Sequence, residues 1–173
     1  MKITRCDPAR HTEAIRAIFN EAILNTTASW AYDPRTPESM AAWFEAKAKR
    51  GFPVNVALDD HGEVLGFATY GAFREHAGYK YTVEHSIYVD ARHRGCGVGS
   101  ALLGDLIAAA GAQDFHVVIG AIDAANPASI ALHKKFGFAH CASIQQAGFK
   151  FGRWLDVEFY QLILKTPARP VER

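Results

Sequence analysis

One short segment restricts the fold of this chain more than any other: Arg92-His93-Arg94-Gly95-Cys96-Gly97-Val98-Gly99-Ser100. It lies between a predicted strand over 81–89 and a predicted helix over 97–110. Glycines at such a junction let backbone N–H groups approach a ligand without obstruction by a Cβ atom. The start of a helix adds a partial positive charge. The segment therefore predicts a strand-to-helix turn that binds a pyrophosphate.

The spacing of the three glycines separates this segment from two common nucleotide-binding motifs. The P-loop pattern G-x-x-x-x-G-K-[ST] is absent, and G-x-G-x-G differs from the dinucleotide-binding G-x-G-x-x-G. The strands predicted before the segment form a meander, whereas a dinucleotide-binding domain opens with a βαβ unit. A tight turn without a ligand is the plain alternative, and an NAD-dependent oxidoreductase is a more distant one.

Size and charge indicate one ordinary globular domain. The 173 residues match the usual length of a single domain, and 49% of them are hydrophobic. Lysine and arginine number 19 against 18 aspartate and glutamate, so the net charge is 19 − 18 = +1. That balance excludes a nucleic-acid binder that works through bulk positive charge. We expect one domain over residues 1–165 and a short tail over 166–173, where two prolines end regular structure.

Cysteine usage and the lack of long apolar segments indicate a cytoplasmic protein. Cys6, Cys96 and Cys141 are odd in number and form no C-x-x-C pair, so neither a disulfide framework nor a structural zinc site is expected. The histidines show no metal-ligand spacing, and we expect no metal. The residues after Met1 lack the apolar core of a signal peptide, and no stretch reaches the about 20 apolar residues of a membrane span.

Hydrophobic periodicity and turn residues predict a mixed α/β fold. Helices are predicted over 8–23, 37–51, 97–110 and 127–136; Asp7-Pro8 opens the first and Asn126-Pro127 the last. Strands are predicted over 2–5, 54–58, 64–70, 81–89, 116–122, 140–149 and 155–164, and residues 71–80 are polar and irregular. This order of elements predicts a mixed sheet rather than a repeat of βαβ units.

Two motifs resemble those of the GNAT acetyltransferase superfamily. Arg94-x-x-Gly97-x-Gly99 is similar to its acetyl-CoA motif (Q/R)-x-x-G-x-(G/A), and Arg92-x-x-Gly95-x-Gly97 fits in a second registration. Residues 126–138 resemble N-x-x-[AS]-x-x-[LF]-[YH]-x-x-x-G-[FY]. The order of elements agrees over nearly the whole chain. The resemblance implies a GNAT fold, with a mixed, mostly antiparallel central sheet and helices on both faces.

Residues 25–30, 82–89 and 148–156 resemble one branch of the superfamily, the phosphinothricin acetyltransferases. This branch includes enzymes that acetylate methionine sulfoximine and methionine sulfone. The resemblance implies an acetyl-CoA-dependent N-acetyltransferase in which the α-amine of such an amino-acid analogue attacks the thioester directly. Resistance to a herbicide or an antibiotic is the implied role. It also implies a homodimer whose other partners are acetyl-CoA and the small amine, without a nucleic acid or a membrane.

The resemblance places acetyl-CoA at the glycine segment, at the end of the strand before it and at Asn126. The strand end would offer backbone groups to the pantetheine arm and an N–H to the developing oxyanion. Asn126 would bond to the arm while it caps its helix. Because of the two registrations, either Arg92 or Arg94 could contact the pyrophosphate. The expected cofactor-binding residues are Ile87, Tyr88, Val89, Arg94, Gly95, Cys96, Gly97, Val98, Gly99, Ser100 and Asn126.

Acetyl transfer to an amine requires a base that removes the ammonium proton. The leaving thiolate must also be either tolerated or protonated by the site. Glu84 lies on the strand before the glycine segment, and the resemblance makes it the base; an exposed strand glutamate is the plain alternative. His133 stands where much of the superfamily has tyrosine, and it could donate the thiolate proton or only pack. Cys96 at a helix start suggests an acyl-cysteine intermediate, which the direct transfer typical of the superfamily disfavours.

The resemblance implies that substrate binds on the irregular segment and on the strand of Glu84. Arg74 suits a carboxylate, phosphinate or sulfonyl oxygen through paired hydrogen bonds, and a solvated loop charge is the alternative. Because Glu75 and His76 differ from the residues usual in the branch, the exact analogue stays open. His85 faces away from Glu84 and so packs beneath the sheet if Glu84 faces the cleft. The expected substrate-binding residues are Arg74, Glu75, His76, Glu84, His85 and Ser86. The resemblance further implies that Lys150, Arg153 and Trp154 shape the pocket or a dimer contact.

Two other functions are consistent with the same motifs. A GNAT enzyme could act on another amine, such as a protein N-terminus, a polyamine or another antibiotic. A regulatory module could bind acetyl-CoA without catalysis. Such a module is expected to lose the base, whereas this chain has Glu84.

Overall fold

The computed structural model describes residues 1–172, which form two compact units. The first unit comprises Met1–Thr69 and Ile87–Asp105, and the second comprises Tyr70–Ser86 and the residues from Leu106 onward. Three elements run from one unit into the other: β3 (Val64–Ala72), β4 (Thr82–Val89) and α3 (Val98–Ala112). The glycine segment lies in the first unit, together with the end of β4 before it and the start of α3 after it.

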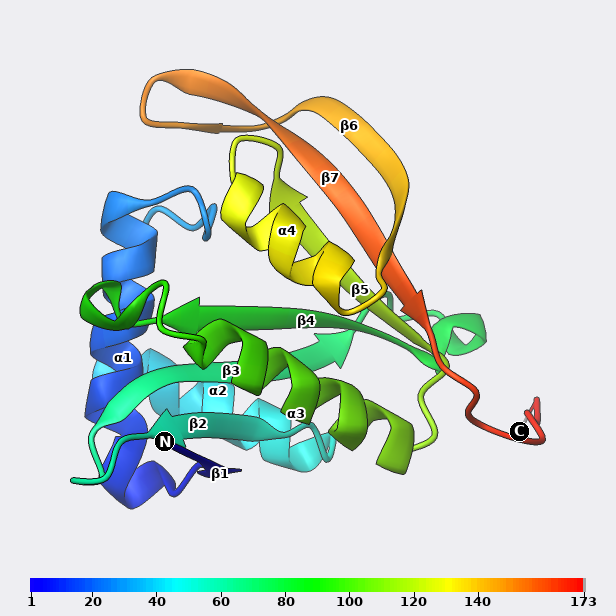
Figure 1. The fold of residues 1–173 in the computed structure, drawn as a ribbon, viewed down its shortest axis with the longest axis horizontal. Helices are drawn as coiled ribbons and strands as arrows, with labels where there is room; N and C mark the ends of the chain where they lie inside the picture. Colours follow the sequence, from blue (N-terminus) through cyan, green and yellow to red (C-terminus); the bar gives the residue numbers. More distant parts are fainter. Residues whose placement is uncertain (173) are drawn as a thin grey trace. The chain divides into compact units, whose positions relative to one another are not determined.

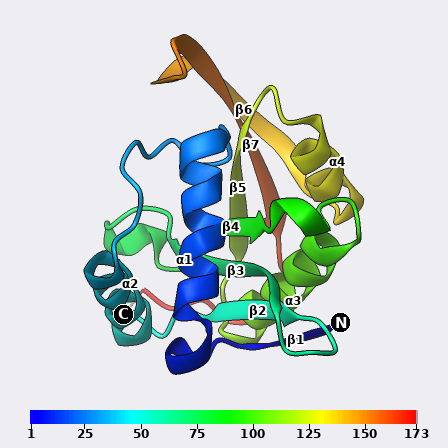
Figure 2. The same cartoon turned by 90° about the vertical axis from the view of Figure 1, so that its left-hand side faces the viewer.

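The first unit has antiparallel strands with helices against both faces (Figures 1 and 2). β1 (Lys2–Arg5) pairs with β2 (Val54–Leu58), and β2 pairs with β3. α1 (Pro8–Asn25) and α2 (Pro37–Lys49) lie on one face, and the start of α3 lies on the other. Asp7 caps α1, and a capping box of Thr36 and Ser39 starts α2.

An aromatic cluster in the core of the first unit holds the end of β4. The ring of Phe19 on α1 lies 5.5 Å from that of Phe67 on β3 and 4.8 Å from that of Tyr88 on β4. Helical spacing on α1 places one apolar face toward these strands. The strand end that precedes the glycine segment is therefore packed against α1 and β3. The buried members of the core cluster are Ile15, Ile18, Phe19, Ile23, Met40, Val54, Val56, Val64 and Phe67.

The second unit contains both parallel and antiparallel strand pairs. β4 pairs in parallel with β5 (Val117–Asp123) over residues 82–84, opposite 117–119. β5 pairs antiparallel with β7 (Arg153–Ile163), and β7 pairs antiparallel with β6 (Ala139–Lys150). α4 (Pro127–Lys135) follows β5 and lies beside it (Figure 1). The short 3-10 turn η1 (Ala77–Tyr79) precedes β4.

β6 and β7 form a long hairpin, drawn in orange in Figure 1. The pairing register shifts between His140 and Ala142 and again between Ile144 and Gly148, and such bulges increase the local twist. Beyond β7, the tail is attached to the second unit by hydrogen bonds: Thr166 Oγ1 donates to Phe115 O at 2.6 Å. Residues 164–172 have no helix or strand, and Arg173, the last residue of the predicted tail, lies outside the described residues.

The predicted fold class is confirmed. Within residues 1–172 the strands follow the order β1-β2-β3-β4-β5-β7-β6 in a mixed, mostly antiparallel sheet. Each predicted helix and strand is present, with its ends shifted by at most two residues. The irregular segment is shorter than predicted, because Phe73 N–H bonds to Thr82 O and the regular pairing continues past Tyr70.

Candidate functional site

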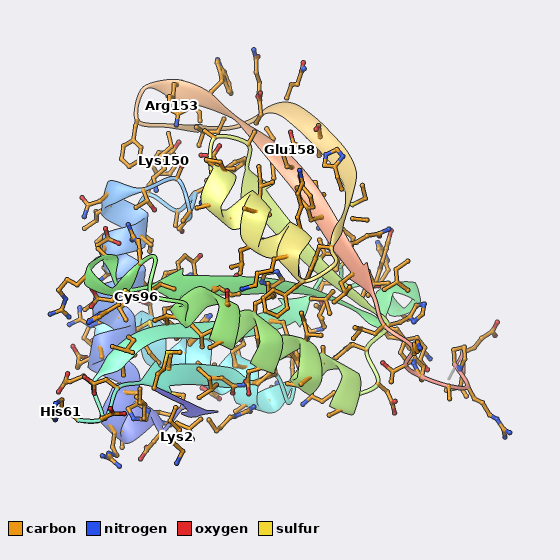
Figure 3. All side chains as sticks on the ribbon, in the orientation of Figure 1. Lys2, His61, Cys96, Lys150, Arg153 and Glu158 are labelled. Carbon is orange, nitrogen blue, oxygen red and sulfur yellow. The ribbon has the colours of Figure 1, made fainter. Side chains whose placement is uncertain are left out.

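The glycine segment forms an exposed loop between β4 and α3 in the first unit. Gly95 and Gly97 have φ angles of 79° and 83°, in the left-handed region that residues with a Cβ atom rarely adopt. A Cβ at either position would meet nothing within 4 Å, so the backbone conformation rather than crowding requires glycine. Val98 is buried and anchors the start of α3, whereas Cys96 is exposed (Figure 3).

Both arginines of the loop are held by carboxylates. Arg92 donates to Asp90 through Nε at 3.0 Å and Nη2 at 2.7 Å, which lowers the pKa of Asp90 to about 2. Arg94 donates from Nη2 to Glu21 Oε2 on α1 at 2.6 Å and from Nε to Val89 O at 3.3 Å. Arg92 is thus tied within its own turn, while Arg94 joins α1 to the end of β4.

The start of α3 fits the expected pyrophosphate. The N–H groups of residues 98–100 belong to the first helical turn, where they have no partner inside the helix and the helix dipole is positive. Gly66 on β3 lets the neighbouring strand end come close. A Cβ there would lie 2.7 Å from Tyr88 O and 3.2 Å from Val89 Cα. The strand end and the loop are therefore positioned together within the first unit.

In the second unit, Glu84 lies half-buried on β4, opposite Ile119 of β5. Burial raises the pKa of its carboxyl, and the positive charge of Arg74 opposes that shift. A raised pKa makes a carboxylate a stronger base, which suits proton removal from an ammonium group. Arg74 lies over the ring of Phe73, 4.3 Å from its centroid, and donates to Phe73 O at 3.0 Å. The structure thus brings Glu84 within electrostatic reach of Arg74.

The other residues expected to bind substrate surround the same strand. Glu75 and His76 are exposed, and His76 stands at the start of η1. Ser86 is half-buried on β4. These assignments stay predictions.

His85 and His133 form a buried stacked pair in the second unit. Their ring centroids are 4.9 Å apart with an interplanar angle of 18°, and their Nε2 atoms are 2.9 Å apart. His133 Nδ1 lies 2.7 Å from Ser129 O. Burial lowers the pKa of both rings, that of His85 to about 3. Gly120 makes room for the pair, since a Cβ there would lie 2.7 Å from His133 Nε2 and 3.1 Å from His85 Nε2.

Two side chains hold the turn between β5 and α4. Asn126 Oδ1 accepts from Ser129 N at 3.1 Å, so the predicted helix cap is confirmed. Asp123 Oδ1 accepts from Ala125 N at 2.9 Å. The second predicted role of Asn126, contact with the coenzyme arm, stays a prediction.

The turn of the β6–β7 hairpin is flanked by Lys150 and Arg153 (Figure 3). Lys150 is buried, and its Nζ lies 5.0 Å from the ring centroid of Phe151. Trp154 is exposed and packs edge-on against Phe149, with centroids 5.1 Å apart. The hairpin end therefore combines one buried cation with exposed aromatic rings.

The described residues include neither a candidate metal cluster nor a candidate membrane span. Within residues 1–172, no group of three or more histidine, cysteine, aspartate or glutamate side chains is placed to hold a metal ion. Over the same residues, no helix has both the length and the apolar character of a membrane span.

Sequence patterns did not single out four residues that shape these sites: Gly66, Gly120, Glu21 and Asp90. From the sequence, a glycine inside a strand predicts only a locally less stable strand. The close contact that requires the glycine is visible only in the structure. Glu21 lies 73 residues from Arg94, so their pairing depends on the tertiary fold. Asp90 had a usable signal, because an aspartate directly after a strand often caps the turn that follows.

Comparison with known proteins gives a consistent result. The model of the acetyltransferase (GNAT) family matches residues 15–138. An L-methionine sulfoximine/L-methionine sulfone acetyltransferase of Pseudomonas paraeruginosa is 49% identical over 155 residues, which cover 90% of each chain. A phosphinothricin N-acetyltransferase of Streptomyces coelicolor is 34% identical over 146 residues, covering 83% of this chain and 85% of the relative.

A solved structure agrees with the fold over nearly the whole length. It is a GNAT superfamily phosphinothricin acetyltransferase from Sinorhizobium meliloti in complex with acetyl-CoA. Its TM-score to this chain is 0.93 at 37% sequence identity, with 98% of this chain and 91% of the other covered.

Proposed function

Because this chain belongs to the GNAT acetyltransferase family, we propose that it transfers the acetyl group of acetyl-CoA to the α-amine of a small amino-acid analogue. Methionine sulfoximine, methionine sulfone and phosphinothricin are the proposed substrates, since the similar proteins are named for them. The observation that carries the proposal is Glu84, a half-buried carboxylate with a raised pKa beside Arg74. It supplies the base that a mere coenzyme-binding module does not need.

Acetyl-CoA is the co-substrate, and its pyrophosphate is assigned to the loop of Gly95 and Gly97 with the first turn of α3. Between the two loop arginines, Arg94 is the better candidate. Its two hydrogen bonds, to Glu21 on α1 and to Val89 O, place it at the end of β4, whereas Arg92 directs both of its hydrogen bonds to Asp90 within its own turn. The backbone of Ile87 to Val89 and the side chain of Asn126 are assigned to the pantetheine arm.

Glu84 acts on the amine before the acetyl group is transferred. Its carboxylate accepts a proton from the substrate ammonium, directly or through a water molecule, and leaves a neutral amine. The amine nitrogen forms a bond to the acetyl carbon while the carbon–sulfur bond breaks. The nitrogen releases its second proton to solvent as the amide forms, and CoA leaves as a thiolate that takes a proton from water. The products are the N-acetyl amino acid and CoA, and the first proton remains on Glu84 until solvent removes it. No covalent enzyme intermediate is required, so Cys96 has no catalytic part in this proposal.

Arg74 is assigned to the acidic or sulfonyl end of the substrate. A guanidinium presents two parallel donors that match such oxygen atoms. Arg74 is exposed and lies close enough to Glu84 to affect its pKa. The base and the anchor are therefore placed to act on one small molecule that carries an amine at one end and an oxyanion at the other.

The test is a thiol-release assay with acetyl-CoA and a panel of amines. The panel contains phosphinothricin, methionine sulfoximine, methionine sulfone, methionine, spermidine and a peptide with a free N-terminus. We expect turnover with the first three. Turnover confined to spermidine or the peptide would overturn the substrate class, and no turnover with any amine would overturn the proposed function.

We also propose that the chain is a homodimer joined through the β6–β7 hairpin, and that it works in the cytoplasm. Five large apolar side chains of this hairpin and its turn are strongly exposed: Ile144 at 50%, Phe149 at 46%, Phe151 at 56%, Trp154 at 60% and Ile163 at 61%. Apolar side chains gathered on one element of a folded protein are typical of an interface. A second copy supplies the same surface, as two-fold dimers do.

A further inference from the structure

The hydrogen bonds of the buried His85–His133 pair run in one direction only. The Ser129 carbonyl oxygen can only accept, so His133 Nδ1, 2.7 Å away, must carry a proton. A neutral imidazole has one N–H, which makes His133 Nε2 an acceptor. His85 Nε2, 2.9 Å from it, must then be the donor. Protons therefore point from His85 to His133 and from His133 to Ser129.

These assignments account for three of the four ring nitrogens, and the fourth is His85 Nδ1. It is an acceptor in the neutral ring, and it is buried without a hydrogen-bond partner among the described residues. A further proton on the pair would have to sit there, where burial disfavours the charge and no acceptor is described. His133 then has no proton in a position to leave. Its one N–H is held by a backbone carbonyl.

The groups in ring contact with the pair include no carboxylate that would stabilise a positive charge. The ring of Phe138 lies 5.8 Å from His85 and 5.0 Å from His133, and the ring of Tyr160 on β7 lies 6.4 Å from His133. From β5 the pair is faced by Gly120. The phenol of Tyr160 is the titratable group on these neighbours. Glu84 precedes His85 on β4, and its side chain points to the other face of the strand.

We propose that His85 and His133 are a neutral positioning pair that orients Glu84, and that His133 is not the proton donor to the leaving thiolate. This inference rests on the proposed acetyl transfer with Glu84 as base. Successive side chains of a strand point to opposite faces, so holding the His85 ring inside prevents β4 from rotating about its axis. Glu84 is thereby held on the other face. CoA leaves as a thiolate, which takes its proton from water.

Nitrogen NMR of the ¹⁵N-histidine-labelled, full-length protein without substrate tests the proposal independently of activity. We expect His133 to carry its proton on Nδ1 and His85 on Nε2, with both rings neutral from about pH 5 to pH 8, the range where free histidine titrates. A coupling across the N–H···N bond between the rings is also expected. An imidazolium in that range, or a proton on His133 Nε2, would overturn the proposal while leaving the acetyltransferase assignment intact.

Two variants at position 133 separate positioning from acid catalysis. In His133→Gln, the side-chain oxygen can reach the former Nε2 position and accept from His85, but it carries no titratable proton. We expect kcat within about fivefold of wild type, with an unchanged pH profile. In His133→Phe the acceptor is lost, and we expect kcat to fall tenfold or more, towards the roughly hundredfold loss that a small misplacement of catalytic groups causes.

The outcomes of this comparison are distinct. A loss of about 10²–10⁴-fold in both variants is what removal of a general acid produces, and it would overturn the proposal. Near-wild-type rates in both would also overturn it, because positioning would then be dispensable. Thermal melting followed by circular dichroism shows whether each variant folds. If neither folds, the NMR of the wild-type protein still decides.

Discussion

At Glu84, two opposite effects act on one carboxyl group. Burial raises its pKa, and the positive charge of Arg74 lowers it. A base must be ionised at the working pH and must also hold a proton well, so the balance between the two effects sets the pH range of turnover. Two substitutions test the two sides of this balance.

Replacing Glu84 by Gln keeps the shape of the side chain and removes the base. We expect kcat to fall by about 10²–10⁴-fold, the usual contribution of a proton-transfer group. Acetyl-CoA binding, measured by calorimetry, should be unchanged. Glu63→Gln, at an exposed glutamate in the first unit, is the matched control. Turnover of Glu84→Gln at the control rate would show that another group is the base.

Replacing Arg74 by Met is expected to move the acid limb of the pH profile. The positive charge lowers the pKa of Glu84, so its loss raises that pKa and leaves the base protonated up to a higher pH. The fall in kcat on acidification should therefore begin at a higher pH than in the wild type. Arg74→Lys keeps the charge and should leave the limb in place. An identical limb in all three proteins would contradict the coupling.

At the scale of the elements, the packing of the second unit requires a glycine at one position of β5, Gly120. β4, β5 and α4 meet at the histidine pair, and Gly120 of β5 lies against both rings. Interiors are close-packed, so an added carbon atom there must displace a ring or the backbone. The first unit uses Gly66 in the same way beside the end of β4.

Gly120→Ala is expected to destabilise the protein by about 1–3 kcal/mol, the usual cost of overpacking. The new Cβ would stand 2.7 Å from His133 Nε2 and would force the rings apart. Urea unfolding measures the change. Gly111→Ala is the control, because it lies inside α3 and its Cβ would meet nothing within 4 Å. That control should gain up to about 1 kcal/mol from helix propensity. Equal stability of the two variants would contradict the packing described.

At the scale of the whole molecule, the exposed hairpin gives the chain an apolar surface that its own fold leaves in solvent. Trp154 is 60% exposed and Phe149 is 46% exposed. Aromatic side chains are enriched at protein interfaces. The proposed homodimer would remove this surface from water.

Trp154→Ser is therefore expected to shift the protein from dimer to monomer at micromolar concentration, as measured by light scattering on a sizing column. The matched control is Leu24→Ser on α1, since Leu24 is 52% exposed but lies far from the hairpin in the chain. A wild-type monomer, or a dimer that survives the Trp154 change undiminished, would contradict the proposed interface.

Local chemistry in the sequence determined the elements and the ligand loop of this protein. Asp7-Pro8 and Asn126-Pro127 predict helix starts because capping acts over two or three residues, and both caps are present. The loop of Gly95 and Gly97 is recognisable because left-handed backbone favours glycine wherever it occurs. Glu84 could be selected from its place on the strand before this loop.

Tertiary structure alone decided how the side chains of the candidate site are held. Arg94 finds Glu21 across 73 residues, and His133 finds His85 across 48. Such partners follow from strand pairing and helix packing, which no local pattern specifies. The protonation of the histidine pair follows in turn from the Ser129 carbonyl and from burial. The sequence therefore predicted that His133 acts as a proton donor or packs, and only the three-dimensional contacts supply the observations from which one of these roles is proposed.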